Sequence, residues 1–428
     1  MLDIKLIRDN AEELRQKLLK RMDEVDFTEV LALDTARREI IQEVEALKAR
    51  RNAASAKIPA LKKEGASIDA IQQEMQEVSA KIKALDTELA KVESAMHTSL
   101  AAFPNIPDDD VPAGGKEQNI VLRTWGQKPT FDFEAKDHVE LVTSLGMVDY
   151  ERGVKMGGRG FWLYKGLGAQ MEWALLNFFI ESHLQDGYEF VLPPHMLTYQ
   201  CGFTAGQFPK FEHDVFQIAG DNEDGSFKHF ILPTAETALI NFHRDEVLQE
   251  EELPKKYFAY TPCYRREAGS YRTQERGMIR GHQFNKVEMF QFTTPEQSDA
   301  ALEELIGKAE KLVQELGLHY QVSKLAAKDC SASMAKTYDL EIWIPSMNEY
   351  KEVSSASNSR EYQPRRGNIR FKRKGAKKPE YIHALNASGL ATSRLLPAIV
   401  EQFQQADGSV LVPKKLRPWV GRDVLYPQ

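Results

Sequence analysis

The chain has 428 residues, which is room for two or three domains, and its 42% hydrophobic and 28% charged residues are ordinary for a globular protein. A net charge of −7 excludes an overall basic field for nucleic acid, although a local patch can suffice. The three scattered cysteines argue against a zinc ribbon or a disulfide framework. No apolar run reaches membrane-spanning length and the N-terminus has no signal-peptide layout, so we expect a cytoplasmic protein without membrane contact.

Residues 1–103 are expected to form an antiparallel helical hairpin. Apolar residues three and four apart continue over four heptads, which is typical of a coiled-coil seam. They are Ile68, Ile71, Met75, Val78, Ile82, Leu85, Leu89, Val92 and Met96. A weaker seam runs from Ile40 to Leu61, and between the seams Gly65 suits a helix end and Ser67 a helix start. The charged surface fits either a solvated coiled coil, or dimer zipper, or an arm that lies along an RNA backbone.

A linker at 104–130 is expected to separate this hairpin from a second domain at 131–428. Its start carries prolines, an acidic run and a glycine pair, none of which continues a helix, and a short strand is predicted near Ile120–Arg123. Beyond it, Gln170–Ile180 is a strongly apolar predicted helix, and Gly187–Pro194 is a predicted strand ended by prolines.

The next candidate site follows a short apolar strand, Phe230–Leu232. If that strand continues, Thr234 and Glu236 share a face, and a buried glutamate facing a pocket can pair with an ammonium group. Such pairs are common on exposed strands, so a surface role is the more frequent meaning of this pattern taken alone.

The most informative stretch runs from Tyr264 to Phe290 and has the pattern strand, polar loop, strand. In the second strand Phe284, Glu288, Phe290 and Phe292 alternate with Val287, Met289 and Gln291. If Tyr264–Ala268 is extended, Arg265 and Glu267 point the same way. Charges on the inner face of a sheet are costly unless an ionic or polar ligand meets them, and a purine nucleotide offers phosphates, an exocyclic amine and a ring. A salt-bridged solvent face is the alternative.

Two further strands are predicted at Lys336–Pro345 and Tyr350–Asn358. In the second, Glu352, Ser354 and Ser355 offer hard oxygen ligands suitable for Mg²⁺, although a polar strand end would look the same. A basic run at 365–378 fits either a solvated loop or an RNA contact.

The last pattern is a strand, a glycine and a helix. Asn386 and Ser388 share a face of the predicted strand Ala384–Leu390. The following helix is predicted to end near Gly408, and Arg394 in its first turn could reach a phosphate at the sheet edge.

Taken together, these stretches resemble the class II aminoacyl-tRNA synthetases. Residues 170–194 are similar to motif 1, residues 264–290 to motif 2 and residues 384–396 to motif 3. Three short segments of this stretch resemble the bacterial type of seryl-tRNA synthetase: Arg-Arg-Glu-Ala-Gly-Ser, His-Gln-Phe and Lys-Val-Glu-Met. The resemblance covers nearly the whole chain in order.

The resemblance implies an α+β fold, with an N-terminal coiled-coil arm that binds tRNA and a class II catalytic domain built on a mixed, mainly antiparallel sheet flanked by helices. It implies a homodimer formed through motif 1. It also implies a serine–tRNA ligase that converts L-serine and ATP to seryl-adenylate with Mg²⁺, then charges tRNA(Ser) and also tRNA(Sec), without an editing domain.

The resemblance assigns site residues by position. ATP binding falls to Arg265, Arg266, Glu267, Arg280, Gly281, His282, Gln283, Phe284, Glu352, Val353, Ser354, Ser355 and Arg394. Serine binding falls to Thr234, Ala235, Glu236, Arg265, Glu288, Asn386 and Ser388. The catalytic residues implied are Arg265, Glu288 and Arg394, and the Mg²⁺ ligands are Glu352 and Ser355.

Departures and rival functions complete the prediction. Ala387 stands where the family usually has Gly, and Ala356 and Ser359 stand where it often has Cys. If Ala387 lies against serine, its methyl group tightens the pocket. One rival is a ligase that loads serine, or another small amino acid, onto a carrier protein. The other is a non-enzymatic RNA-binding or scaffold protein that retains a dead class II domain.

Overall fold

The computed structural model describes residues 1–63, 65, 67–220, 228–267 and 277–428. The chain divides into two compact units, Met1–Pro104 and Asn105–Gln428. Among the described helices, none combines the length and apolar character that crossing a bilayer requires.

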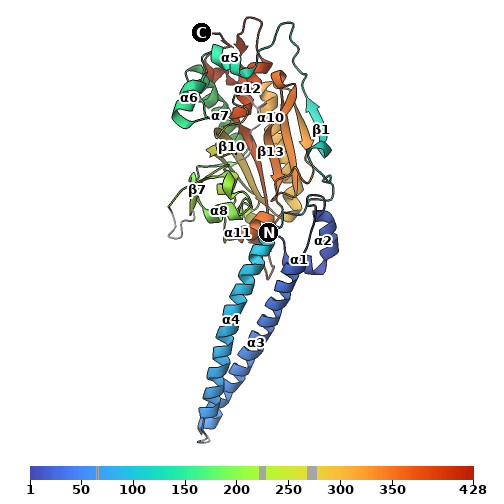
Figure 1. Cartoon of the computed structure of the whole chain (residues 1–428), viewed down its shortest axis with the longest axis vertical. Coiled ribbons are helices and arrows are strands. Elements are labelled where there is room, and N and C mark those ends of the chain that lie inside the picture. The colour runs from blue at the N-terminus through green and yellow to red at the C-terminus, as the bar shows by residue number, and fades with distance from the viewer. Residues whose placement is uncertain (64, 66, 221–227, 268–276) are drawn as a thin grey trace. The chain divides into compact units, whose positions relative to one another are not determined.

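The first unit is helical and contains a long hairpin (Figure 1). Its helices are α1 (Ile4–Asp9), α2 (Ala11–Leu18), α3 (Thr28–Lys63) and α4 (Asp69–Ala102). The predicted antiparallel pair is confirmed in α3 and α4, whose core consists of Ile40, Val44, Val78 and Ile82. Towards the turn the seam residues Ile58, Leu61, Ile71 and Met75 are only half-buried. The seam is therefore closely packed in its middle and loose at its tip.

The turn of the hairpin follows its predicted chemistry where it is described. Gly65 has φ +69°, a left-handed conformation that suits glycine after a helix. The Ser67 hydroxyl accepts a hydrogen bond from the Asp69 amide at 3.2 Å, at the start of α4. Glu64 and Ala66 lie outside the described residues.

The second unit is built on an eight-stranded sheet in the order β1-β11-β12-β13-β16-β10-β9-β4. These strands are β1 (Ile120–Trp125), β11 (Tyr320–Lys324), β12 (Lys336–Ile344), β13 (Glu349–Asn358), β16 (His383–Ala391), β10 (Gln283–Thr293), β9 (Lys255–Tyr264) and β4 (Glu189–Val191). All neighbouring pairs are antiparallel except β4 with β9, which confirms the expected mixed, mainly antiparallel sheet.

Helices cover one face of this sheet and smaller elements cover the other. The covering helices are α5 (His138–Ser144), α7 (Leu167–Gln185), α10 (Ser298–Leu316) and α12 (Thr392–Gln402). In β10, Val287 and Met289 join the core beneath these helices, whereas Phe290 and Phe292 join a second core on the opposite face. The predicted alternation is therefore confirmed, and both faces of the strand are buried.

Short elements complete the second unit. The helices are α6 (Tyr150–Gly157), α8 (Tyr199–Thr204), α9 (Glu236–Leu239), α11 (Tyr362–Gly367) and α13 (Arg417–Val420). The strands are β2 (Val148–Asp149), β3 (Leu163–Tyr164), β5 (Met196–Thr198), β6 (Phe216–Gln217), β7 (His229–Ile231), β8 (Val247–Gln249), β14 (Arg370–Lys372), β15 (Glu380–Tyr381), β17 (Val410–Leu411) and β18 (Val424–Leu425).

Two conditions placed on strand extensions are not met, and one predicted helix end is wrong. The strand at 230–232 does not continue, because Pro233 has no amide hydrogen for a ladder, and α9 begins at Glu236 instead. Strand β9 ends at Tyr264, and Glu267 has φ +48°, so 264–267 is not extended throughout; Ala268–Ser270 lie outside the described residues. Helix α12 ends at Gln402 rather than near Gly408, since Gln404 already pairs with Val410 in a β-bridge.

Candidate active site

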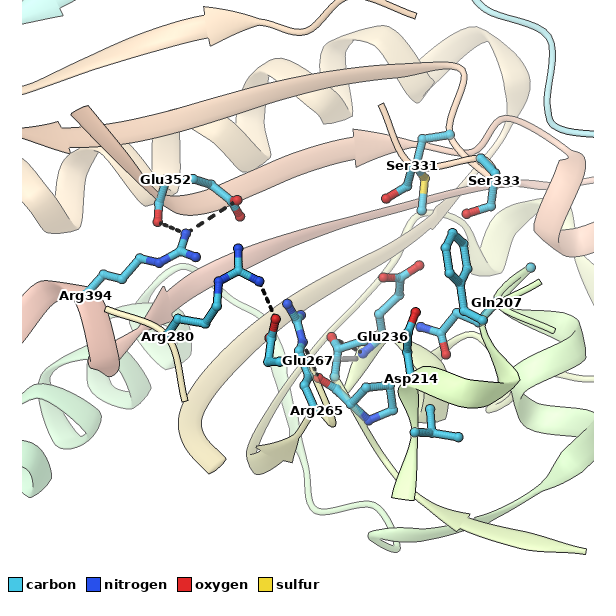
Figure 2. Close-up of a pocket in the computed structure, with 17 residues that line it drawn as sticks. Gln207, Asp214, Glu236, Arg265, Glu267, Arg280, Ser331, Ser333, Glu352 and Arg394 are labelled. Atoms are coloured by element: carbon cyan, nitrogen blue, oxygen red, sulfur yellow. Dashed lines mark hydrogen bonds and ion pairs between the residues drawn. The ribbon is translucent and has the colours of Figure 1, made fainter. Parts of the chain in front are cut away.

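A cavity of about 450 Å³ opens beside the central strands of the sheet (Figure 2). Seven residues predicted from the sequence line it: Thr234, Glu236, Arg265, Glu267, Arg280, Glu352 and Arg394. A second cavity of about 70 Å³ is lined by some of the same residues and by four further predicted ones: Gly281, Phe284, Val353 and Ser388. Segments separated by more than a hundred residues in sequence thus meet at one place.

One side of the larger cavity holds a buried network of opposite charges. The Lys286 ammonium donates to the Thr234 hydroxyl at 2.7 Å and forms an ion pair with Glu288. Asn386 donates from Nδ2 to Glu288 Oε1 at 2.9 Å, and its Nδ2 lies 3.4 Å from Glu236 Oε2. Since all five side chains are at least half-buried, this polar network is sheltered from water and suited to holding a small zwitterion.

The protonation of Glu236 is the most perturbed property of this network. Burial, and next the negative charge of Glu288, raise the pKa of Glu236 to about 7. Hydrogen bonding from Gln363, whose Nε2 donates to Glu236 Oε1 at 2.7 Å, and the charges of Lys286 and Arg265 act in the opposite direction. An ammonium group placed beside Glu236 would favour its charged form.

The other side of the cavity collects guanidinium groups. Arg280 forms an ion pair with Glu267, and the Arg265 guanidinium lies 5.2 Å from the centre of the Phe284 ring. In Figure 2 the side chains of Arg265, Arg280 and Arg394 approach one another from three separate segments. Three cations beside an aromatic ring form a site for a polyanion with an aromatic group.

Arg394 is held by two backbone oxygens. Its NH1 donates to the Glu352 carbonyl at 2.6 Å and its Nε to the Ile279 carbonyl at 3.1 Å. The same guanidinium lies 3.6 Å from the Glu352 carboxylate. These contacts aim the side chain into the cavity from the first turn of α12, as the sequence predicted.

The predicted Mg²⁺ ligands lie close together on β13. The Ser355 hydroxyl lies 3.2 Å from Glu352 Oε1 and donates to Asp339 Oδ1 at 2.5 Å. Burial works to raise the pKa of Glu352, but Arg394 and Arg265 outweigh it and hold that pKa below its usual value. Burial and the charge of Glu352 raise the pKa of Asp339 well above its ordinary value. Oxygen donors of this kind suit Mg²⁺.

A Mg²⁺ ion here would still need ligands from elsewhere. Within the described ranges no group of three or more His, Cys, Asp or Glu side chains is arranged for a metal. Mg²⁺ usually keeps several waters and takes one or two carboxylates plus substrate phosphates, so a partial protein site beside the guanidinium groups fits it.

Several predicted residues lie near the cavities without being among their lining. Ala235 and Ser354 are fully buried, and the Ser354 hydroxyl donates to the Ser388 carbonyl at 2.7 Å. Arg266 is exposed and donates to the His213 carbonyl, while His282 bonds the Arg265 carbonyl through Nδ1 at 2.9 Å. The remaining members of this group are Gln283, Glu288, Ser355 and Asn386.

The condition placed on Ala387, that it lies against serine, is not met. Ala387 is fully buried between Asn386 and Ser388, and strand alternation turns its methyl group into the core beneath the helices. There it lies opposite Met289 on one neighbouring strand and Ala356 on the other. The serine side of the cavity is therefore not narrowed by this substitution.

Among the residues that sequence reasoning missed, three contact predicted site residues directly. Lys286 is two positions before Glu288, so strand alternation could have placed both on one face. Asp339 faces Ser355 only through the register of β12 with β13. Gln363 comes from α11 and carries no motif, so no local signal identifies it.

The basic run at 365–378 is partly structural. Arg366 is buried, and its guanidinium donates to the Phe208 carbonyl at 2.9 Å and to the Tyr362 hydroxyl at 2.8 Å. Arg373 forms ion pairs with Glu250, Glu296 and Glu380. These two arginines are therefore held by protein groups and do not belong to a simple solvated loop.

Comparison with known proteins agrees with the geometry. Residues 1–107 match the seryl-tRNA synthetase N-terminal domain, and residues 216–403 match the tRNA synthetase class II core domain (G, H, P, S and T). The chain is 64% identical to serine–tRNA ligase 2 of Clostridium acetobutylicum, over 99% of this chain and 100% of that one. It is 47% identical to the serine–tRNA ligase of Syntrophobacter fumaroxidans, over 98% and 99% of the two chains.

Solved structures show the same likeness in three dimensions. The seryl-tRNA synthetase of Pyrococcus horikoshii, complexed with ATP, superposes with a TM-score of 0.92 at 33% identity, covering 100% of both chains. The cytoplasmic serine–tRNA ligase of Naegleria fowleri, in complex with AMP, gives 0.87 at 26% identity, covering 100% of this chain and 99% of that one. Sequence and structure agree along the whole length, and the chain belongs to the seryl-tRNA synthetase family of class II aminoacyl-tRNA ligases.

Proposed function

We propose that the two cavities together bind ATP and L-serine and form seryl-adenylate, which then charges tRNA. The observation that carries this assignment is the meeting of three guanidinium groups with a buried carboxylate network in adjoining cavities. The guanidinium side suits the phosphates and the carboxylate side suits the serine ammonium.

Serine binding uses the buried network. Glu236 and Thr234 take the ammonium group, with Glu288 alongside, while Arg265 takes the carboxylate. Ser388, which lines the smaller cavity, and Asn386, which lies beside Glu288 and Glu236, take the side-chain hydroxyl. A site that hydrogen-bonds this hydroxyl rejects alanine, because its own polar groups would be left unpaired.

ATP binding exchanges existing contacts for ligand contacts. Glu267 pairs with Arg280 in this structure, so its carboxylate becomes available to the adenine amine when Arg280 turns to the outer phosphates. Phe284 stacks on the adenine ring and Arg394 joins Arg280 on the phosphates. Other groups at the edge of the nucleotide are Arg266, Gly281, His282, Gln283, Val353 and Ser354.

In the first step an oxygen of the serine carboxylate bonds to the α-phosphorus and the bond from that phosphorus to the bridging oxygen breaks, which releases pyrophosphate. Arg265 lies where it can contact both reacting groups. In the second step a terminal ribose hydroxyl of the tRNA takes the seryl group and AMP leaves. The protein contributes mainly orientation and charge stabilisation.

Glu352 and Ser355, with Asp339 behind them, are the residues that would hold Mg²⁺. The ion would neutralise negative charge on the ATP phosphates. The support is the chemistry of the donor set and its position beside Arg394.

We also propose the division of labour in the chain. Residues 1–103 form a tRNA-binding arm, 104–130 a connecting segment and 131–428 the catalytic domain. The substrates would be tRNA(Ser) and also tRNA(Sec), and the work would take place in the cytoplasm. Support comes from the helical hairpin and from the match of residues 1–107 to the family's N-terminal domain.

A homodimer formed through motif 1 completes the proposal. Large apolar side chains are exposed on α7 and along the segment after it: Trp173, Leu184, Phe190, Leu192 and Met196. Leu192 is 71% exposed and Trp173 is 53% exposed. Large apolar side chains exposed on neighbouring segments of the chain favour an interaction site here.

The decisive experiment measures serine-dependent exchange of pyrophosphate into ATP, followed by aminoacylation of purified tRNA(Ser). Arg265→Ala is expected to abolish exchange while the folded state is retained, because it removes the group common to both substrates. Exchange at the parental rate would contradict the assignment. Exchange without tRNA charging would favour a carrier-protein ligase, and no exchange by the parent would favour the non-enzymatic alternative.

A further inference from the structure

A buried carboxyl group lies where three elements of the catalytic unit meet. Glu172 belongs to α7 and is 3% exposed. Its Oε1 accepts hydrogen bonds from the Thr392 hydroxyl at 2.6 Å and from Asn285 Nδ2 at 2.7 Å. A buried carboxyl group is costly unless hydrogen-bonded, so these two bonds fix the side chain in one position.

The two donors belong to the elements that carry the nucleotide site. Asn285 directly follows Phe284 on β10, and Thr392 opens α12 two residues before Arg394. The Thr392 hydroxyl also lies 3.2 Å from the Asn285 carbonyl oxygen. Helix α7, strand β10 and helix α12 lie side by side (Figure 1), and Glu172 connects all three through one oxygen atom.

The start of α12 depends on this connection more than a helix start usually does. Ala391 occupies the N-cap position and has no side-chain oxygen to accept the first amides. The Glu172 carboxyl instead holds the first residue of the helix, near the positive end of the helix dipole. The position of Arg394, in that same first turn, is therefore set from α7.

The Glu172 carboxyl group acts through its hydrogen bonds rather than through a net charge. Burial raises the pKa of Glu172, while the hydrogen bonds from Thr392 and Asn285 oppose that rise. Among the described residues, Oε2 has no hydrogen-bond partner that meets normal geometry. A neutral side chain with an oxygen at the Oε1 position would satisfy the same two donors.

We propose that Glu172 is a positioning residue for ATP, which holds Phe284 and Arg394 in their relative places by accepting hydrogen bonds from Asn285 and Thr392. The inference rests on the proposed ATP-binding roles of Phe284 and Arg394. It assigns Glu172 no contact with the substrates, and it predicts an effect on ATP that does not extend to serine.

The test uses serine-dependent pyrophosphate exchange by the full chain, with KM for ATP, KM for serine and kcat measured separately. Glu172→Met removes the acceptor at similar size and is expected to raise the ATP KM about tenfold while the serine KM changes less than about twofold. Glu172→Gln keeps an oxygen acceptor and is expected to stay within about threefold of the parent in ATP KM.

Two further variants keep the inference falsifiable if Glu172→Met does not fold. Thr392→Val removes only one donor hydroxyl and is expected to raise the ATP KM in the same selective way. Glu310→Met is the matched control, because Glu310 is a buried carboxylate on α10 that accepts from Arg123 and Tyr320 and lines neither cavity. It is expected to lower thermal stability without raising the ATP KM.

The outcomes separate this inference from the site assignment. If Phe284→Ala and Arg394→Ala leave the ATP KM unchanged, the assignment of the nucleotide site is wrong. If they raise it but Glu172→Met and Thr392→Val do not, the positioning role is wrong. Equal changes in both KM values, or failure of Glu172→Gln to restore the ATP KM, would likewise reduce Glu172 to a general structural residue.

Discussion

At the scale of single residues, the serine side of the site contains two buried carboxyl groups and one buried cation. Glu236 and Glu288 are both carboxylates, and Lys286 is the cation held against one of them. The ion pair leaves Glu236 as the carboxylate whose charge changes near neutral pH. Affinity for an ammonium group should follow that change.

The first prediction concerns pH. Because the pKa of Glu236 is raised to about 7, this group is protonated below that pH in the free enzyme and loses its attraction for an ammonium. The KM for serine should rise as pH falls below 7, approaching about tenfold per pH unit, and level off above it. Steady-state pyrophosphate exchange between pH 5.5 and 8.5, about the range in which groups of this pKa titrate, measures this.

Glu236→Gln is the control for the pH experiment. It should give a higher serine KM with the slope below neutral pH removed. A serine KM that rises in the same way in Glu236→Gln would assign the titration to another group.

The second prediction concerns Lys286. Replacing it with methionine leaves the buried Glu288 without its cation and removes the hydrogen bond that Lys286 donates to the Thr234 hydroxyl. Lys286→Met should lower the free energy of unfolding by about 3 kcal/mol and raise the serine KM. Urea unfolding and exchange kinetics give the two values.

The double variant Lys286→Met with Glu288→Gln tests the reason. It should recover part of the lost stability, because the uncompensated charge is gone, yet it should not recover serine affinity. If the loss of unfolding free energy in the double variant equals the sum of the losses in the two single variants, Lys286 does not stabilise the protein through the buried ion pair.

At the scale of elements, the pairing of β13 with β16 explains why an unusual residue is tolerated. Ala387 and Ala356 lie directly opposite each other in the core. The resemblance implies glycine as the usual residue at the first position and cysteine as a frequent one at the second. One added methyl group faces one missing thiol, so the volume between the strands is nearly conserved.

The third prediction follows from this pairing. Ala387→Gly should destabilise by about 1 kcal/mol through a small void and a looser strand, and Ala356→Cys should destabilise by about 1–3 kcal/mol through overpacking. The double variant should be more stable than the sum of the two losses predicts. Neither change should alter the serine KM, since these side chains face away from the cavity. Additive losses would contradict compensation.

Features that depend on residues close together in the sequence could be predicted, and features that depend on contacts between distant residues could not. The faces of β10 and the seam of α4 depend on local periodicity, and both are confirmed. The turn of Glu267 out of the strand could not be predicted, because it accompanies an ion pair with Arg280, thirteen positions away. Asp339 and Gln363 depend on register and on packing between distant elements, which no local pattern encodes.

At the scale of the whole molecule, the proposed homodimer would cover the apolar side chains exposed on α7 and in the residues after it. The fourth prediction is that the parent sediments as a dimer and that Leu192→Asp sediments as a monomer, because a charge in an apolar contact is costly to bury. Leu411→Asp is the matched control: this exposed leucine on β17 lies outside the patch and should leave the dimer intact. A monomeric parent, or an equal effect of both variants, would refute the proposed interface.

The long hairpin of the first unit has a consequence for how it meets a flexible, irregular ligand. Its tightly packed layer lies at Ile40, Val44, Val78 and Ile82. Beyond this layer, towards the turn, Ala54 is the one buried residue among those that the structure describes. Local separation of the two helices should therefore begin at the turn and stop at this layer. Amide exchange at 50–63 and 67–75 should be fast while that at 78–92 stays slow, and bound tRNA should slow exchange selectively at 50–63 and 67–75.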